Sequence, residues 1–280
     1  MEPKELDQQG EVVGEMRVTV AFRYCRVALI ATALTTILSC LSANASGVLS
    51  GNLRIESKIL GYDLYYRVYV PEAASADDQL PTLYVTDGHS YIENGKFPEL
   101  LDKEISAGRV QPLIVVFVDS RNPDKLSENR RNQQFFCKKD YAGFFTQELV
   151  TEIDASYPTS ANRRSRVILG LSFGGFNSGC FGLLATETFS GIAMQSPANG
   201  PMVDELTKLY RHSDKLPLKI FLSVGTIRDN TVAGRKFKNT LQAKNYDLTY
   251  KEVKKTHNWR NWRPLLDDVL LAFFPVPSSK

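Results

Sequence analysis

Arg166-Val167-Ile168-Leu169-Gly170-Leu171-Ser172-Phe173-Gly174-Gly175 runs from an apolar stretch into a glycine-rich turn. The pattern G-x-S-x-G in this stretch would arise by accident about 0.1 times in a chain of this length. Its setting, between a strand and a helix, is typical of a nucleophile elbow, whose glycines leave room for crowded backbone. We therefore predict that Ser172 is a nucleophile and that the Phe173 N–H faces a developing oxyanion. The alternative is a packing turn with an idle serine.

Apolar stretches alternate with amphipathic ones on both sides of this motif. Buried parallel strands are predicted at 82–86, 113–118, 167–171, 191–195, 218–224 and 248–253. Helices are predicted at 97–105, 141–156, 176–185, 203–210, 233–244 and 259–274. Two β-rich runs, 53–60 and 65–70, come first, and Gly61-Tyr62-Asp63 between them suits an antiparallel hairpin. The fold class is therefore α/β, a mostly parallel sheet with helices on both faces, and the short segment after Gln195 leaves no space for a large lid.

A serine hydroxyl needs a base that removes its proton, and the chain offers three histidines. His257 follows the last predicted strand, at the carboxyl edge of the sheet where ligands bind. His212 lies in a polar stretch, where a solvated loop histidine is expected, and His89 lies upstream of Ser172. Only His257 leaves room for an acid in the chain order serine, acid, histidine. We predict that His257 is the base.

The acid should follow the strand between those of the serine and the histidine. Asp229 is the first carboxylate after 218–225, and it would hold the imidazole tautomer and stabilise the imidazolium. Asp204 and Asp214 also lie between Ser172 and His257, but they precede that strand. Asp229 is the predicted acid, with Asp204 and Asp214 as alternatives.

The composition excludes several classes of protein. With 43% apolar and 23% charged residues, 18 Gly and 13 Pro, the chain is neither disordered, collagenous nor a coiled coil. Its 34 basic and 31 acidic residues are too balanced for a nucleic-acid partner. The four cysteines form no C-x-x-C pair of the kind that zinc sites use. Neither a metal nor a cofactor is expected.

The chain begins with a leader that has the pattern of an export signal. The first 15 residues hold one Lys and five acidic residues, whereas Met16 begins a stretch with three arginines and no acid. An uncharged apolar run at 27–41 follows, and then Ala43-Asn44-Ala45, the small-x-small pattern of a cleavage site. We predict a signal peptide at residues 1–45, with translation starting at Met16.

Cleavage after Ala45 would leave residues 46–280 as one periplasmic or secreted domain without stable membrane insertion. A membrane anchor is the first alternative, but a spanning helix wants about 20 strongly apolar residues. A lipoprotein modified at Cys40 is the second. Export would permit Cys137 and Cys180, the two cysteines that remain, to pair, but the sequence does not show how close they lie.

Three segments together carry a resemblance to a known family. They are Leu83-Tyr84-Val85-Thr86-Asp87-Gly88, Leu169-Gly170-Leu171-Ser172-Phe173-Gly174-Gly175 and His257-Asn258-Trp259-Arg260-Asn261-Trp262-Arg263. The chain resembles the "putative esterase" family of α/β-hydrolases, which includes enterochelin esterases, S-formylglutathione hydrolase, feruloyl esterases and secreted mycolyltransferases. The resemblance implies the α/β-hydrolase fold and a second oxyanion N–H from the residue after Asp-Gly, which is His89 here. Residues 129–134 depart from the family, because they lack the acid that often follows an arginine there.

These observations predict an exported serine esterase that acts on a small-molecule ester through an acyl-enzyme. Acyl transfer to a sugar or lipid alcohol is the alternative that the mycolyltransferase relatives imply, and a non-catalytic binding protein on the same scaffold is the second. The substrate could be anionic or sugar-linked. The loop at 119–131 carries Arg121, Lys125, Arg130 and Arg131, which could attract an anion or form a solvated surface. Trp259 and Trp262 are expected to pack their helix.

Overall fold

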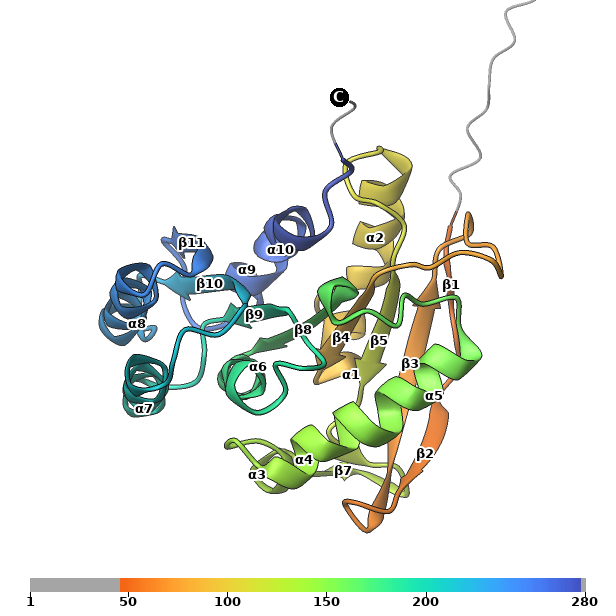
Figure 1. Ribbon diagram of the computed structural model, residues 1–280, viewed down its shortest axis with the longest axis horizontal. Helices are drawn as coiled ribbons and strands as arrows, with labels where there is room; N and C mark the ends of the chain where they lie inside the picture. Colours follow the sequence, from red (N-terminus) through yellow and green to blue (C-terminus); the bar gives the residue numbers. More distant parts are fainter. Residues whose placement is uncertain (1–45, 278–280) are drawn as a thin grey trace, which may run out of the picture. The chain divides into compact units, whose positions relative to one another are not determined.

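The computed structural model describes residues 46–277, so the predicted signal peptide at 1–45 lies outside the described residues. All six predicted parallel strands form within this part of the chain (Figure 1). They are β4 (Thr82–Thr86), β5 (Ile114–Val118), β8 (Arg166–Leu171), β9 (Gly191–Gln195), β10 (Lys219–Gly225) and β11 (Asp247–Val253). Their order in the sheet is β5-β4-β8-β9-β10-β11, and each neighbouring pair is parallel.

Three N-terminal strands extend this sheet beyond β5 with antiparallel pairing. The strands are β1 (Val48–Leu49), β2 (Leu53–Ser57) and β3 (Tyr62–Val70), and β3 pairs antiparallel with β1, β2 and β5. Gly61 turns the chain with a φ of 72°, a backbone conformation that glycine adopts without steric cost. The hairpin turn therefore ends at Gly61, and β3 begins at Tyr62, three residues before the predicted start of that strand.

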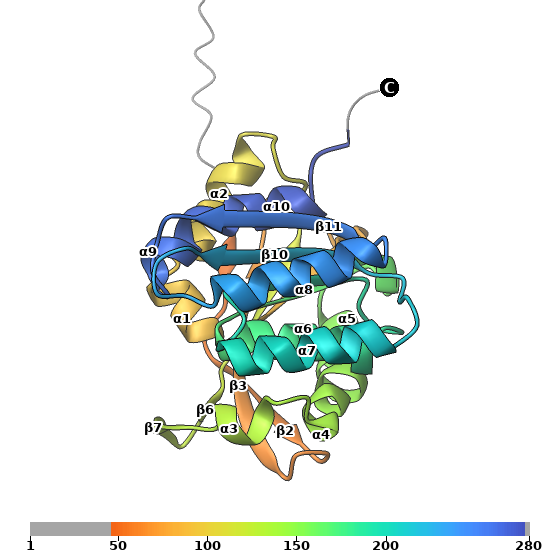
Figure 2. The same ribbon diagram turned by 90° about the vertical axis from the view of Figure 1, so that its left-hand side faces the viewer.

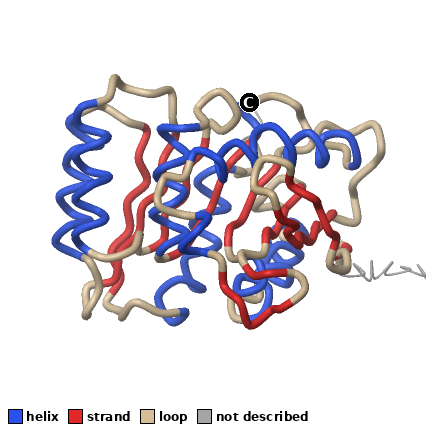
Figure 3. Tube along the Cα trace, turned by 90° about the horizontal axis from the view of Figure 1, so that it is seen from below, coloured by secondary structure: helices blue, strands red, loops and turns tan. Residues whose placement is uncertain are grey.

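Side chains alternate between the two faces of the sheet, so each face has its own apolar core. On β4, Leu83 and Val85 point into one core and Tyr84 into the other. The first core is covered by α1 (Gly88–Glu93), α2 (Phe97–Ser106), α9 (Trp259–Trp262) and α10 (Leu266–Phe273). The second is covered by α4 (Lys139–Gly143), the π-helix η1 (Phe144–Leu149), α5 (Val150–Ser156), α6 (Phe173–Leu184), α7 (Gly200–His212) and α8 (Thr231–Ala243). Helices thus flank the strands on both sides, which confirms the predicted α/β class (Figures 1 and 3).

Two predicted helices are interrupted. Residues 141–156 form the successive segments α4, η1 and α5, and residues 259–274 form α9, the 3-10 turn η3 (Arg263–Leu265) and α10. Pro264 lies in η3, and the missing N–H of proline explains why a regular helix does not continue there. Six further elements lie outside the predicted runs: β1, α1, β6 (Arg121–Asn122), β7 (Lys125–Asn129), α3 (Arg131–Gln134) and the 3-10 turn η2 (Arg163–Ser165). β7 is as long as β4, but most of its residues are exposed, so it shows no apolar run.

The parallel strands all end at one edge of the sheet, which gathers the turns that follow β4, β8, β9, β10 and β11. Between β9 and β10 the chain forms only α7, which lies beside α8 in Figure 2, so the expectation of no large lid is confirmed. Among the helices of residues 46–277, none combines the length and the hydropathy that a membrane crossing requires.

Candidate active site

The turn between β8 and α6 has the geometry of a nucleophile elbow. Ser172 adopts a φ of 52° and a ψ of −122°, which L-residues rarely do, and it directly precedes the first residue of α6. A Cβ at Gly170 would lie 2.1 Å from the Gly174 carbonyl oxygen, and one at Gly174 would lie 2.7 Å from Thr86 Oγ1. Because a side chain at either position would collide with its surroundings, both glycines of G-x-S-x-G are required for this turn.

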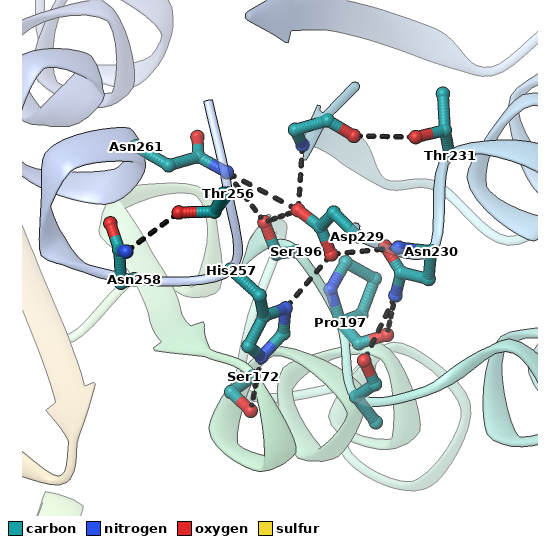
Figure 4. A network of polar contacts seen from close by, with 12 residues as sticks. Ser172, Ser196, Pro197, Asp229, Asn230, Thr231, Thr256, His257, Asn258 and Asn261 are labelled. Carbon is teal, nitrogen blue, oxygen red and sulfur yellow. Dashed lines mark hydrogen bonds and ion pairs between the residues drawn. The ribbon is translucent and has the colours of Figure 1, made fainter. Parts of the chain in front are cut away.

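The structure brings Ser172, His257 and Asp229 together (Figure 4). His257 Nε2 lies 2.8 Å from Ser172 Oγ, and His257 Nδ1 lies 2.8 Å from Asp229 Oδ1. The three residues come from the turns after β8, β11 and β10. The Trp262 ring packs edge-on against the imidazole, with ring centroids 5.0 Å apart. The imidazole is therefore held between a hydroxyl and a carboxylate, in the order that a serine nucleophile requires.

Asp229 is held by more than its histidine. Its fully buried side chain accepts hydrogen bonds at Oδ2 from the Gly225 N–H, from Ser196 Oγ at 2.7 Å and from Asn261 Nδ2 at 3.2 Å. Burial alone would raise the pKa of Asp229, but the hydrogen bonds from His257, Ser196 and the backbone outweigh it and lower the pKa. Asp229 is therefore ionised at neutral pH and fixed in one orientation.

Sequence reasoning did not single out Ser196 and Asn261. Ser196 follows β9 at the carboxyl edge of the sheet, so the strand-end rule that found Asp229 could also have found it. Asn261 lies in α9 and also donates to Ser196 Oγ at 3.1 Å. Nothing in the sequence signals this contact, because it joins a helix and a turn that only the folded chain brings together.

The alternative acids and the other loop histidine lie outside this cluster. Asp204 accepts a hydrogen bond from Lys236 Nζ at 2.8 Å, and Asp214 is exposed after the end of α7. His212 is exposed at the end of α7, and its Nδ1 lies 2.9 Å from the Lys208 carbonyl oxygen. None of the three makes a hydrogen bond with Ser172 or His257 in residues 46–277.

The two backbone donors predicted for an oxyanion begin neighbouring helices. Phe173 is the first residue of α6 and His89 the second residue of α1, and these helices follow the adjacent parallel strands β8 and β4. N–H groups in the first turn of a helix have no intrahelical partner, so both are free to bind an anion. The His89 imidazole contacts Asp119, with Nδ1 3.2 Å from Oδ1. The oxyanion role of both donors stays a prediction.

A buried ion pair lies between these two helix starts. Asp87 accepts a hydrogen bond from Ser120 Oγ at 2.8 Å and pairs with Arg131 at 3.1 Å, and burial raises its pKa against the opposing effect of both partners. The Arg131 guanidinium also lies 5.5 Å from the Phe173 ring centroid. The Arg131 guanidinium is therefore paired within the protein and lies next to the residue that follows Ser172.

Each arginine of the 119–131 loop forms an ion pair with a carboxylate of the protein. Arg121 pairs with Asp119 at 2.7 Å and Arg130 with Glu128 at 3.3 Å, in addition to Arg131 with Asp87. Burial alone would raise the pKa of Asp119, but the contacts with His89 and Arg121 outweigh it and hold this pKa well below its usual range. Lys125, the fourth cation of this loop, is exposed and has no ion pair within residues 46–277, so the expectation that the loop attracts an anion stays a prediction.

Two connected hollows open beside the serine. The inner hollow has a volume of about 440 Å³, and its lining residues are Ser172, Phe173, Ala198, Asn199, Gly200, Arg228, Asp229, Asn230 and His257. The outer hollow, of about 670 Å³, shares Gly200, Arg228, Asp229 and Asn230 and continues along the start of α8. Arg228 is exposed in both and has no hydrogen bond or ion pair with another residue of the 46–277 region.

A disulfide joins Cys137 to Cys180, with the two Cα atoms 5.0 Å apart. It ties the segment between α3 and α4 to the middle of α6. Phe136, next to the bond, packs its ring against Phe173 with centroids 5.0 Å apart, so the disulfide anchors one wall of the site. Trp262 is buried and Trp259 packs edge-on against Tyr91. Both tryptophans therefore pack α9, in agreement with the sequence-based expectation.

No group of three or more His, Cys, Asp and Glu residues in the 46–277 region is arranged to hold a metal ion.

A mostly parallel sheet with a serine at a strand-to-helix turn and a histidine after the last strand defines the α/β-hydrolase class. A family model described as "Putative esterase" matches residues 57–273. The chain belongs to this family, and it is a carboxylic ester hydrolase.

Solved structures with the same fold include three esterases. A ferulic acid esterase is 17% identical with a TM-score of 0.66, and the match covers 81% of this chain and 98% of that one. An enterobactin esterase from Shigella flexneri, in the presence of enterobactin, is 19% identical with a TM-score of 0.68, and the match covers 80% of this chain and 58% of that one. An S-formylglutathione hydrolase from Staphylococcus aureus is 15% identical with a TM-score of 0.63, and the match covers 81% and 98%. At these identities the likeness concerns the fold alone.

Proposed function

We propose that this protein is a serine esterase that hydrolyses small-molecule carboxylic esters through an acyl-enzyme. The observation that carries the proposal is the pair of 2.8 Å contacts, from Ser172 Oγ to His257 Nε2 and from His257 Nδ1 to Asp229 Oδ1. A serine hydroxyl is a weak nucleophile until such a base takes its proton. The low pKa of Asp229 supports its role, because an ionised carboxylate stabilises the imidazolium that forms.

In the first half of the reaction, Ser172 Oγ attacks the ester carbonyl while His257 Nε2 takes the hydroxyl proton. The tetrahedral intermediate collapses when His257 returns this proton to the leaving alcohol, which leaves an acyl group on Ser172. In the second half, His257 removes a proton from water, the hydroxide attacks the acyl-enzyme, and the acid leaves as Ser172 is protonated again. The Phe173 and His89 N–H groups hold the oxyanion in both intermediates.

The test is the S172A variant, assayed with p-nitrophenyl acetate and with a fluorophosphonate that labels active serines. We expect hydrolysis and labelling to fall to background. The matched control is S178A, on the same helix, where the hydroxyl only bonds the Gly174 carbonyl at 3.1 Å. Activity retained in S172A would refute the proposal. Product analysis with an added alcohol distinguishes hydrolysis from acyl transfer.

We also propose that residues 1–45 are removed on export and that the mature protein works in the periplasm or outside the cell. The Cys137–Cys180 disulfide supports this, because disulfides persist in oxidising compartments. The test is the N-terminal sequence of the protein recovered from the cell envelope or the medium. Ser46 at the N-terminus is the expected result, and a lipid on Cys40 or an intact leader would refute it.

A further inference from the structure

We propose that Arg228 binds an anionic group on the alcohol half of the substrate, so that the enzyme prefers esters of anionic alcohols. The inference rests on the proposed function, because it takes Ser172 as the nucleophile and His257 as the group that protonates the leaving alcohol. What carries it is the inner hollow, whose lining residues include Ser172, His257 and the unpaired Arg228.

Arg228 differs from the other cations along the two hollows in having no partner. Lys236 Nζ bonds Asp204 at 2.8 Å. Arg235 bonds Glu252 through two nitrogens, at 2.8 and 2.7 Å. Arg228 has no such contact with any residue between 46 and 277, and it is exposed. Its charge is therefore available to a ligand, and that of its neighbours is not.

The neighbouring carboxylate does not neutralise Arg228, although the two residues are adjacent in the chain. Both oxygens of Asp229 are engaged by other donors, namely His257, Ser196, Asn261 and the N–H groups of Gly225 and Asn230. The same bonds fix the loop from which Arg228 projects. Arg228 itself adopts a left-handed φ of 49°, a conformation that costs a non-glycine residue free energy.

The position of His257 indicates that the inner hollow holds the alcohol half of the ester. His257 must hand its proton to the leaving oxygen, so the alcohol half lies on the His257 side of Ser172. The inner hollow is lined by His257 and Arg228 on that side. A planar guanidinium binds carboxylate and phosphate oxygens through two parallel hydrogen bonds, so either anion on the alcohol would be recognised.

The test compares two small esters that differ in the charge of the alcohol, 4-acetoxybenzoate and 4-acetoxybenzamide. In the R228Q variant, we expect the ratio of kcat/KM for the anionic ester over the neutral one to fall about tenfold, the size of one charge-assisted contact. R228K keeps the charge without the planar fork and should give an intermediate ratio. The matched control is R211Q, which removes an exposed arginine at the far end of α7 and should leave the ratio as in the wild type.

Three outcomes would overturn the inference while leaving the proposed function intact. The ratio could be the same in R228Q as in the wild type, or R211Q could lower it as much as R228Q does, which would indicate a general effect of net charge. The loss could also fall on phenyl hemisuccinate relative to phenyl butyrate, which would move the anion to the acyl half. Hydrolysis retained in S172A would instead defeat the proposed function itself. Thermal unfolding of each variant checks that it folds.

Discussion

Removing the Cys137–Cys180 disulfide should lower the stability of the protein far more than its activity. The bond closes a loop of 43 residues between the segment before α4 and the middle of α6. In the chain-entropy description, a cross-link over such a loop stabilises the fold by about 4 kcal/mol, because it restricts the unfolded chain. For a domain of this size each kcal/mol corresponds to about 2–4 °C in Tm. The C137A/C180A variant should therefore unfold about 8–16 °C below the wild type.

Activity should respond less, because the disulfide joins none of the turns that carry His257 and Asp229. Its effect on the site is limited to the wall formed by Phe136 and Phe173. We expect kcat/KM for p-nitrophenyl acetate at 25 °C to stay within about threefold of the wild type, since the hydrogen bonds of the triad are formed elsewhere.

The assay is calorimetric unfolding of the wild type and the variant, each with and without reductant. Reductant should bring the wild type down to the Tm of C137A/C180A and leave the variant unchanged, which makes the variant its own control. A difference in Tm of less than about 3 °C, with the disulfide verified by mass, would contradict the reasoning. It would mean that residues 137–180 are already restricted in the unfolded chain.

Three further predictions concern the triad and the elbow. D229N should lower kcat about 10⁴-fold, because the amide favours the wrong imidazole tautomer, whereas D204N should leave kcat as it is; steady-state kinetics measures both. The fold lowers the pKa of Asp229, so the stability that its contacts provide is complete above its unfolded pKa of about 3.9 and is lost as the pH falls through the lower folded value. The difference in urea midpoint between the wild type and D229N should therefore shrink from about pH 7 to about pH 3. G170A should lower kcat at least about 100-fold, because the added Cβ would lie 2.1 Å from the Gly174 carbonyl oxygen and would displace the turn that holds Ser172. The control is G143A, which should keep its activity because its added Cβ would come no nearer than 3.5 Å to any neighbouring atom.

The strand ends were the most predictable part of the molecule. A buried parallel strand is a short apolar run bounded by polar residues, so the bounds of β4 and β9 follow from the sequence to the residue. The nucleophile, base and acid candidates each lie in the turn after such a strand, and the order of the strands brings these turns to one edge. Local patterns therefore sufficed to predict that Ser172, Asp229 and His257 lie at this edge, where the structure brings them into contact.

Contacts between distant turns could not be predicted in this way. Arg131 was one of four cations in a polar loop, and only the folded chain places its guanidinium beside Asp87. The sequence does not predict that Arg228 is unpaired, because the partners of a charged side chain are set by the fold. The same holds for the disulfide, since no sequence pattern reports that Cys137 and Cys180 have Cα atoms 5.0 Å apart.

The backbone conformation of Ser172 links the stability of this protein to its activity. A residue with a side chain held at a φ of 52° and a ψ of −122° costs the fold about 1–3 kcal/mol, which glycine would not. The rest of the domain has to offset that cost. If Ser172 is the nucleophile, as proposed, glycine at this position would stabilise the fold and abolish the reaction.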